Sequence, residues 1–186
     1  QPLMRAAKLI HSAVMLWREI ATGKYMRGIG ADGLEAACLH DIYSTNRIPA
    51  SSACDVLERR PYSSHIVIAW DGLFFPFTVV CDGEVIEVSK IFTDLRHLEL
   101  DMRDLESESR QTPVGVLTTM ERDKWHYLRE ELSEHSLSGH SLEQIESALF
   151  VVCLDLDFQN ENRDVVWRHF RDMEAENRWY DKSLQL

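Results

Sequence analysis

The sequence lacks the features of a membrane-spanning or disulfide-stabilised protein. None of its apolar runs approaches the roughly 18 residues that a transmembrane helix requires. It has only four cysteines in 186 residues, and no two of them form a C-x-x-C pair. A zinc knuckle and a thioredoxin motif are therefore excluded. We expect a reducing compartment and no disulfide framework.

Basic residues are also scarce. The chain has 20 Lys and Arg against 31 Asp and Glu, and most of the acidic excess lies in residues 94–186, which carry a net charge of −10. Binding to nucleic acid or to an anionic membrane requires clusters of Lys and Arg that neutralise phosphate. We therefore expect no nucleic-acid partner.

What the sequence does contain is an alternation of helical and strand patterns. Apolar residues at three- and four-residue steps predict helices, and short runs rich in Val, Ile and Phe predict strands. The predicted helices are residues 3–20, 34–44, 89–104, 120–134, 141–147 and 162–173. The predicted strands are residues 65–70, 73–81, 84–88, 114–118, 148–154 and 178–186, with polar loops at 105–113 and 133–140. This interleaving predicts an α/β fold with a mixed sheet.

Two dipeptides predict tight turns between the first three strands. Asp71-Gly72 and Asp82-Gly83 are strong hairpin signals, because the favoured two-residue turn needs positive φ angles. Pro76 removes a backbone donor from the middle strand, so that strand is expected at a sheet edge or at a bulge. The three strands are predicted to form a meander.

Two histidines lie four residues before a carboxylate. His97 and Asp101 form the first pair, and His126 and Glu130 form the second. A histidine beside a carboxylate can act as the general base of an acyltransferase. On a helix, however, the same spacing describes an exposed ion-pair face. We favour the ion-pair interpretation for both pairs.

Candidate metal and phosphate sites are incomplete. Asp155 and Asp157 follow a buried strand and could hold a divalent cation, but two carboxylates are too few ligands. His135 and His140 flank a Ser/Gly loop without a third ligand. Residues 28–33 spell G-x-G-x-x-G, yet they follow a helix instead of the strand that a dinucleotide site needs. We predict no metal site.

The most unusual run is N-R-W-Y-D-K-S-L-Q at residues 177–185. Interpreted as an alternating strand, it carries Arg178, Asp181 and Lys182 beside two aromatic residues. Charges near a sheet core must be paired, because isolated buried charge is costly. The run predicts either a structural ion-pair network or a catalytic role, and both stay open at this point.

This run resembles the N-R-W-[FY]-D-K-[ST]-x-Q segment of the carnitine/choline acyltransferase family. Four further blocks are similar to family segments in the same order: S-T-N-R-I-P at 44–49, the paired strands of 65–79, L-T-T-x-x-R-x-x-W within 113–125, and S-L-x-x-I-x-x-A-L-F-x-V-C-L-D at 141–155. The block at 141–155 and the opening helix with Arg5, Ala6 and Ala7 look most similar to the mitochondrial carnitine palmitoyltransferase branch. Five ordered blocks identify the chain as a member of this family.

The resemblance implies a chloramphenicol-acetyltransferase-like fold, with residues 1–186 forming part of the N-terminal domain of a longer protein. It implies transfer of an acyl group, expected to be a long-chain fatty acyl group, between coenzyme A and carnitine in mitochondria. Coenzyme A is then a co-substrate, and no other cofactor is expected. The remaining partner is the C-terminal domain, which supplies most substrate contacts in the family.

The family's general base is a histidine in an E-H-x-x-x-[DE]-G type motif, and none of the eight histidines here matches that motif. We expect it beyond residue 186, so no catalytic or substrate-binding residue is assigned within the chain. The sequence also departs from the family at residues 169–176, where the usual glycines before N-R-W are missing. A degenerate, non-catalytic relative that acts in binding or assembly is therefore the alternative hypothesis.

Overall fold

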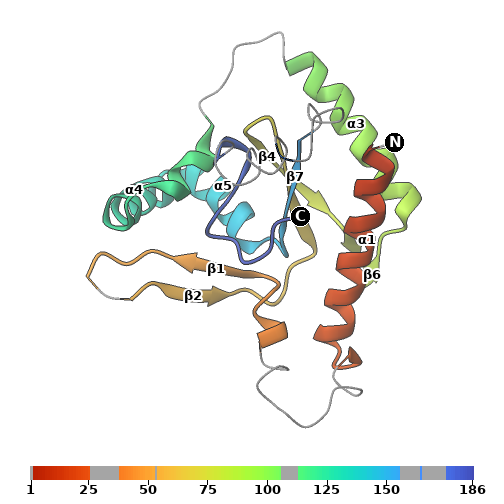
Figure 1. Cartoon of the computed structure of the whole chain (residues 1–186), viewed down its shortest axis with the longest axis horizontal. Helices are drawn as coiled ribbons and strands as arrows, with labels where there is room; N and C mark the ends of the chain where they lie inside the picture. Colours follow the sequence, from red (N-terminus) through yellow and green to blue (C-terminus); the bar gives the residue numbers. More distant parts are fainter. Residues whose placement is uncertain (1, 26–37, 53, 106–112, 156–163, 165–174) are drawn as a thin grey trace. The chain divides into compact units, whose positions relative to one another are not determined.

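The computed structural model describes residues 2–25, 38–52, 54–105, 113–155, 164 and 175–186. They fall into two compact units, the first made of Gln1–His40 with Thr78–Thr112 and the second of Asp41–Phe77 with Pro113–Leu186. Helices combine with parallel and antiparallel strand pairs, which confirms the predicted α/β class with a mixed sheet (Figure 1). No described helix is long and apolar enough to cross a membrane.

Two amphipathic helices form most of the first unit. α1 (Pro2–Ala21) and α3 (Val88–Leu105) pack side by side through their apolar faces (Figure 1). The buried residues are Leu3, Ala7, Ile10, Val14 and Ile20 in α1, and Ile91, Leu95 and Met102 in α3. Their three- and four-residue spacing gives each helix one buried stripe. Both predicted helices are confirmed.

A short hairpin belongs to the same unit. β5 (Val80–Cys81) and β6 (Glu84–Val85) pair antiparallel around Asp82 and Gly83, whose φ angles are 51° and 79°. Two successive positive φ angles are those of a type I′ turn, as the Asp-Gly pair predicted. The pairing is confined to this hairpin and forms a sheet of its own.

The second unit contains a three-stranded sheet in the order β4-β3-β7. β3 (His65–Trp70) and β4 (Leu73–Thr78) are joined by the predicted turn, and β7 (Val151–Leu154) pairs with β3 in parallel. β4 lies at the edge and Pro76 is exposed there, as expected of a residue without an N–H donor. The predicted meander is interrupted after β4. The strand predicted at 73–81 breaks at Val79, and its end pairs with residues 84–85 as the separate hairpin β5–β6.

A second hairpin, β1 (Thr45–Ile48) with β2 (Val56–Arg59), was not predicted. A helix over residues 34–44 had been expected, with Ile42 and Tyr43 on its buried side. Residues 26–37 lie outside the described part of the chain. Tyr43 is buried, whereas Ile42 is 36% exposed.

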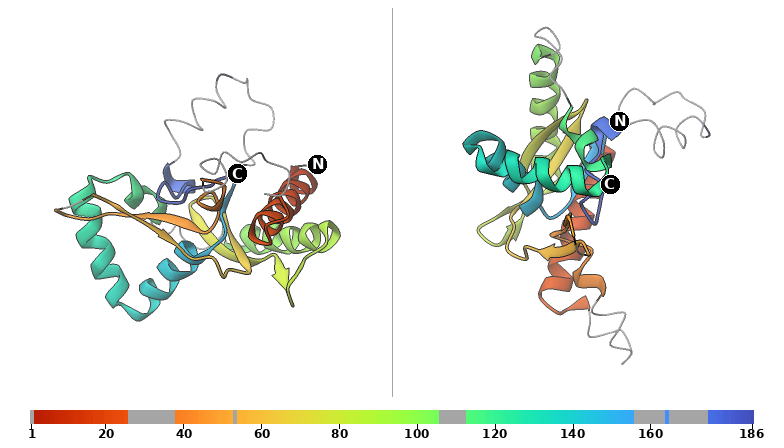
Figure 2. Two further views of the ribbon diagram at one scale, coloured as in Figure 1. Left: turned by 90° about the horizontal axis from the view of Figure 1, so that it is seen from below. Right: turned by 90° about the vertical axis from the view of Figure 1, so that its left-hand side faces the viewer.

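The helical part of the second unit differs from expectation in two places. Residues 114–118 were predicted to be a strand, but they belong to a 3₁₀ helix, η2 (Val114–Thr119). The predicted polar loop at 133–140 is mostly helix, because α5 (Ser136–Ser147) begins directly after α4 (Arg122–Glu134). His135, with φ −84° and ψ 130°, breaks the two helices apart, and Figure 2 shows the bend between them. α4 confirms the helix predicted at 120–134.

The core of the second unit lies between these helices, the sheet and the last residues of the chain. Its buried members are Val67, Ala69, Trp125, Leu142, Ile145, Ala148, Val151 and Trp179. Residues 178–186 do not form the predicted strand. A 3₁₀ turn, η5 (Ala175–Asn177), precedes them, and single bridges join Lys182 to Asn46 and Gln185 to Val151. The helix predicted at 162–173 lies outside the described residues except at 164.

Candidate functional site

The five sequence blocks converge almost entirely in the second unit. They supply β1, the β3–β4 pair, η2 with the start of α4, α5 with β7, and the run 177–185. Polar side chains from these elements meet around that run in three clusters. The contacts of each side chain decide whether the run has a structural or a catalytic role.

The first cluster joins the end of β7 to η5. Arg178, only 3% exposed, donates from its two terminal nitrogens to the two carboxylate oxygens of Asp155, at 3.1 Å and 2.7 Å. Asn177 donates from Nδ2 to the same carboxylate at 2.8 Å, and its Oδ1 accepts from the Gly72 N–H at 3.4 Å. A bidentate Arg–carboxylate pair combines strength with fixed geometry. Asp155 is thereby committed to partners within the protein.

The second cluster centres on Asp181. Its Oδ1 accepts from Arg47 Nε at 2.7 Å, and its Oδ2 accepts from the indole nitrogen of Trp125. Burial raises the pKa of the Asp181 carboxyl, and the hydrogen bonds from Trp125 and Arg47 oppose that rise. Arg47 also donates to Asp55 at 3.0 Å, which fixes the loop between β1 and β2. The cluster therefore links β1, α4 and the run 177–185.

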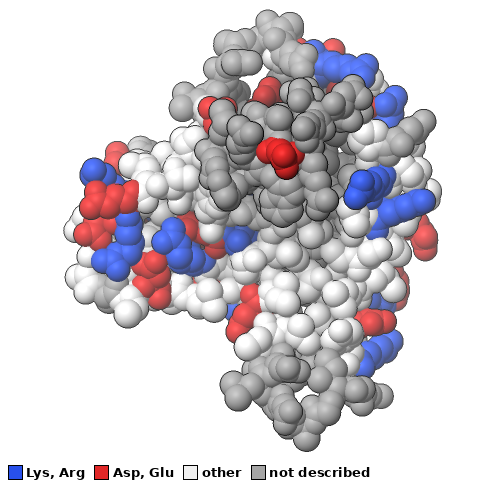
Figure 3. All heavy atoms as spheres, in the orientation of Figure 1, with Lys and Arg blue, Asp and Glu red and all other residues white. Residues whose placement is uncertain are grey.

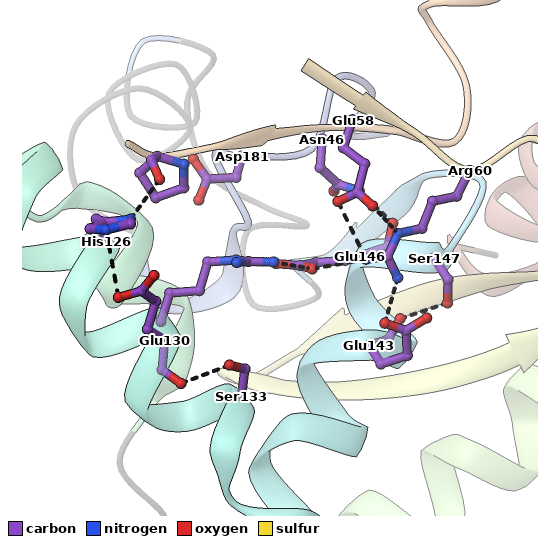
Figure 4. A network of polar contacts seen from close by, with 12 residues as sticks. Asn46, Glu58, Arg60, His126, Glu130, Ser133, Glu143, Glu146, Ser147 and Asp181 are labelled. Carbon is purple, nitrogen blue, oxygen red and sulfur yellow. Dashed lines mark hydrogen bonds and ion pairs between the residues drawn. The ribbon is translucent and has the colours of Figure 1, made fainter. Parts of the chain in front are cut away.

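The third cluster centres on Glu146 of α5. Arg129 of α4 donates from Nε and Nη2 to the two carboxylate oxygens of Glu146, both at 2.7 Å, and Arg60 approaches the same carboxylate at 3.6 Å. Figure 4 shows Arg60 reaching from the end of β2 toward Glu143 and Glu146 of α5. Burial would lower the pKa of Arg129, but hydrogen bonding to Glu146 and its charge outweigh that effect and raise it. The pair thus joins α4 to α5 through two parallel hydrogen bonds.

Lys182 is buried beside this cluster. Its Nζ donates to the backbone carbonyl oxygen of Glu146 at 2.8 Å, and Asn46 donates from Nδ2 to the same oxygen. Burial lowers the pKa of Lys182 from 10.5 to about 7, against the charge of Glu146, which raises it. A buried amine that is partly neutral at neutral pH could serve as a base, but at 4% exposure Lys182 is closed to a substrate.

Trp179 anchors the run 177–185 in the core. Trp179 packs edge-to-face against Trp125 and Phe74, with ring centroids 6.1 Å and 5.6 Å away. Its backbone N–H donates to Gln185 Oε1 at 2.9 Å, which closes the run on itself. Cys153 donates to the same oxygen at 3.7 Å, and burial raises the pKa of its thiol to about 12. That thiol is a packing group and not a nucleophile.

A glycine lets η2 approach the run at backbone distance. A Cβ atom on Gly115 would lie 2.5 Å from the carbonyl oxygens of both Arg178 and Glu176. Three residues after Gly115, the Thr118 hydroxyl accepts from the Tyr180 N–H at 3.1 Å and donates to Gly115 O. Asn177, Arg178, Trp179, Asp181 and Lys182 are therefore buried with partners inside the protein, whereas Tyr180 is 43% exposed. This supports the ion-pair interpretation of the run.

The predicted histidine–carboxylate pairs lie apart from these clusters. His97 and Asp101 are both exposed on α3 in the first unit. On α4, His126 Nε2 lies 3.6 Å from Glu130, and its Nδ1 is 2.9 Å from the carbonyl oxygen of Pro49. Figure 4 shows this ring pointing toward the β1–β2 loop. The ion-pair interpretation fits the second pair, and the two side chains of the first pair are exposed to solvent.

The candidate metal ligands are likewise separated. Asp155 binds Arg178, and Asp157 lies outside the described residues, as do residues 28–33. His135 and His140 are exposed. Among the described residues no group of three or more His, Cys, Asp or Glu side chains is arranged to hold a metal ion.

Charges alternate in sign on the surface around α4. Lys124 pairs with Glu121 at 3.2 Å and Arg122 with Asp123 at 3.4 Å. In the view of Figure 3 this region, on the left, carries red and blue atoms side by side. Such a mixed surface differs from the clustered Lys and Arg of nucleic-acid-binding proteins.

A sequence profile of the choline/carnitine O-acyltransferase family matches residues 1–186. The chain belongs to this family. The match covers both structural units, and it agrees with the resemblance carried by the five blocks.

Individual relatives come from two branches of the acyltransferase family. Choline O-acetyltransferase of Danio rerio is 28% identical over 200 residues, covering 99% of this chain and 31% of that protein. The mitochondrial carnitine O-palmitoyltransferase 2 of Xenopus tropicalis is 30% identical over 165 residues, and its Homo sapiens counterpart is 29% identical; each match covers 88% of this chain and 24% of the relative. The chain thus spans between a quarter and a third of these relatives. The similarity to the two branches is alike, so it does not favour the palmitoyltransferases.

Sequence patterns alone did not reveal several members of the three polar clusters. Arg60, Arg129 and Glu146 were not singled out, because each sits in an ordinary helical or loop context. The block at 141–155 contains Glu146, and the block at 44–49 contains Asn46 and Arg47. The available signal was therefore the resemblance of whole blocks, not the spacing of charged residues.

Proposed function

We propose that this chain is part of an enzyme that transfers an acyl group, most specifically a long-chain fatty acyl group, between coenzyme A and carnitine. The observation that carries the proposal is the family match over residues 1–186, together with the convergence of all five family blocks on one buried polar network. The similarity to two proteins named mitochondrial carnitine O-palmitoyltransferase 2 supports the carnitine acceptor and a mitochondrial location. The activity is proposed for the full-length protein.

In the proposed reaction a general base removes the proton from the carnitine hydroxyl, and the oxygen attacks the thioester carbonyl carbon. A new C–O bond forms, the C–S bond breaks, and the proton leaves with the coenzyme A thiol. The base is proposed to be a histidine beyond residue 186. No further cofactor or metal enters this scheme, because the thioester is already activated and the step needs only a base and stabilisation of a tetrahedral oxyanion.

The described residues have a supporting role in this proposal. Asp181 accepts from Trp125 and Arg47, and Glu146 accepts from Arg129, so both carboxylates already have cationic or N–H partners. At 5% and 4% exposure neither carboxylate is open to a substrate. These clusters fix the scaffold that carries the run 177–185, and the chemistry is assigned elsewhere.

A second acceptor is supported by a separate observation. The choline O-acetyltransferase of Danio rerio matches 99% of this chain, a larger share than the palmitoyltransferases match. Choline carries the same reacting group as carnitine, a hydroxyl. Acetyl transfer to choline is therefore the second candidate function, and a non-catalytic role in binding or assembly is the third.

The test uses the full-length protein and measures release of the coenzyme A thiol. Palmitoyl-CoA with carnitine is compared with acetyl-CoA with choline, each with and without the alcohol. Thiol release that depends on carnitine supports the proposal. Release that depends on choline alone transfers the assignment to the second candidate, and no alcohol-dependent release with either pair supports the non-catalytic role.

A histidine variant locates the base. His97→Ala should keep the full rate, because His97 is exposed on α3 and is proposed to take no part in the reaction. Loss of activity in His97→Ala, with the protein still folded, would contradict a base beyond residue 186 while leaving the reaction itself in place.

A further inference from the structure

Asn46 and Lys182 face each other where β1 meets the end of the chain. Their backbones form an isolated antiparallel bridge, and they are 0% and 4% exposed. Directly opposed residues of an antiparallel pair have neighbouring side chains. Both side chains donate to one atom, the carbonyl oxygen of Glu146, with Lys182 Nζ at 2.8 Å. The amide and the amine therefore converge on the same buried point.

The hydrogen-bonding groups at this point do not balance. Within the described part of the chain, Asn46 Oδ1 is buried and has no hydrogen-bond partner. Lys182 Nζ has one acceptor, although an ammonium group has three N–H donors. Turning the Asn46 amide over does not help, because its oxygen would then face the Glu146 carbonyl oxygen. An unpartnered buried polar atom costs about 1–3 kcal/mol. It is therefore unfavourable for Asn46 Oδ1 to lack a donor while Lys182 Nζ has N–H groups without an acceptor.

We propose that one buried water molecule lies between Asn46 Oδ1 and Lys182 Nζ. The water donates to Asn46 Oδ1 and accepts from Lys182 Nζ, which satisfies both groups. Buried waters typically make about three hydrogen bonds to polar groups that would otherwise be unpartnered. The proposal is independent of the acyl-transfer activity, because it rests on the bonding of Asn46 and Lys182 alone.

The surrounding atoms select a neutral molecule. A cation would lie against the Lys182 amine, and an anion would lie against Asn46 Oδ1 and the Glu146 carbonyl oxygen, which are both acceptors. The occupant must both donate and accept a hydrogen bond, and it must be small enough for a closed site. Water meets these conditions. It also fits both forms of Lys182, since it can accept from the ammonium and donate to the neutral amine.

A crystal structure of the full-length protein at a resolution that shows ordered waters is the first test. A water peak within hydrogen-bond distance of both Asn46 Oδ1 and Lys182 Nζ supports the proposal. The proposal is overturned if the space is empty, or if a side chain or backbone group from elsewhere in the full-length protein meets Asn46 Oδ1.

Oxygen-17 relaxation dispersion gives a second test in solution, because it counts long-lived internal waters. Lys182→Met removes the proposed donor with little change of shape and should lose one such water. Lys124→Met, at an exposed lysine of α4, is the matched control and should lose none. An equal count in the wild type and Lys182→Met overturns the proposal. If Lys182→Met does not fold, the wild-type crystal structure decides alone.

Discussion

The indole N–H of Trp125 donates a hydrogen bond to Oδ2 of Asp181, which joins the first turn of α4 to a residue 56 positions further along the chain. Both side chains are buried. Since Arg47 occupies Oδ1 of the same carboxylate, one aspartate holds a helix, a hairpin and the run 177–185 together. The charge of Asp181 is therefore compensated inside the protein, and its loss should be felt at all three elements.

Asp181→Asn should destabilise the second unit by about 1–3 kcal/mol. An amide cannot accept on both sides, so the buried indole N–H of Trp125 or the Arg47 guanidinium loses its acceptor, and an unpartnered buried donor typically costs this much. Arg47 keeps its bond to Asp55 and its side chain is 38% exposed, so the loss of the Asp181 charge adds little. Urea unfolding followed by the fluorescence of Trp125 and Trp179 measures the change. Glu131→Gln, an acid-to-amide change on the exposed face of α4, should alter stability by less than about 0.5 kcal/mol. Equal effects of the two variants would contradict the role of Asp181.

Gly115→Ala should destabilise the protein by at least about 1–3 kcal/mol. The new methyl group would lie 2.5 Å from two backbone carbonyl oxygens, and backbone cannot move aside as a flexible side chain can. Val114→Ala is the neighbouring control, since Val114 is 43% exposed and its truncation removes little packing. The midpoints of thermal unfolding of both variants give the comparison. A Gly115→Ala midpoint equal to that of Val114→Ala would mean that η2 does not approach the run this closely.

The contrast between α1 and η2 shows how much of the fold the sequence could predict. α1 has twenty residues with a repeating apolar stripe, so its type and its buried face follow from periodicity. η2 has six residues, which are too few to separate a strand from a helix by period. What decides its form is the close approach of Gly115 to the carbonyls of residues 175–178. Such a contact between distant segments cannot be seen in a local pattern.

The β1–β2 hairpin was missed for a related reason. β1 has the sequence T-N-R-I, which lacks the apolar alternation of a half-buried strand. Its polar residues are buried because Asn46 meets Glu146, and Arg47 meets Asp181, more than 90 positions away. For the same reason the candidate site could be located only through whole family blocks. Charged residues considered one at a time offered only pairs such as His97 and Asp101, for which an exposed ion-pair face was the favoured interpretation, and the fold leaves both on the surface.

Ser44→Gly should stabilise the protein by about 1 kcal/mol. Ser44 has a φ of 56°, which costs a residue with a Cβ roughly 1–2 kcal/mol, and its buried hydroxyl has no hydrogen-bond partner in the described part of the chain. Glycine removes both costs and gives back about 0.5–1 kcal/mol in backbone entropy. Ser64→Gly, at an exposed neighbour of β3, provides the comparison for the entropy term alone. Denaturant midpoints measure both, and a less stable Ser44→Gly would contradict this account.

Lys182 should make stability rise with pH above neutrality. Its pKa is about 7 in the folded protein and near 10.5 in the unfolded chain, so between these values the unfolded state binds more protons. The free energy of unfolding should therefore increase as pH rises through this window, by up to about 1.4 kcal/mol per pH unit. Glu146, Glu58 and Arg60 are the other charged groups that act on Lys182: the two carboxylates raise its pKa and Arg60 lowers it.

The interval from pH 7 to 9 is the best place to measure this slope. The Cys153 thiol, with its pKa raised from 9.0 to about 12 by burial, has the opposite effect above pH 9, because there the unfolded chain loses its proton first. Lys182→Met should flatten the rise between pH 7 and 9, whereas Lys124→Met, at a side chain that is 69% exposed, should keep it. Urea titrations of the three proteins at several pH values provide the comparison. Parallel profiles for the wild type and Lys182→Met would contradict this account. They would mean that Lys182 stays charged in the folded protein and that another group causes the rise in stability.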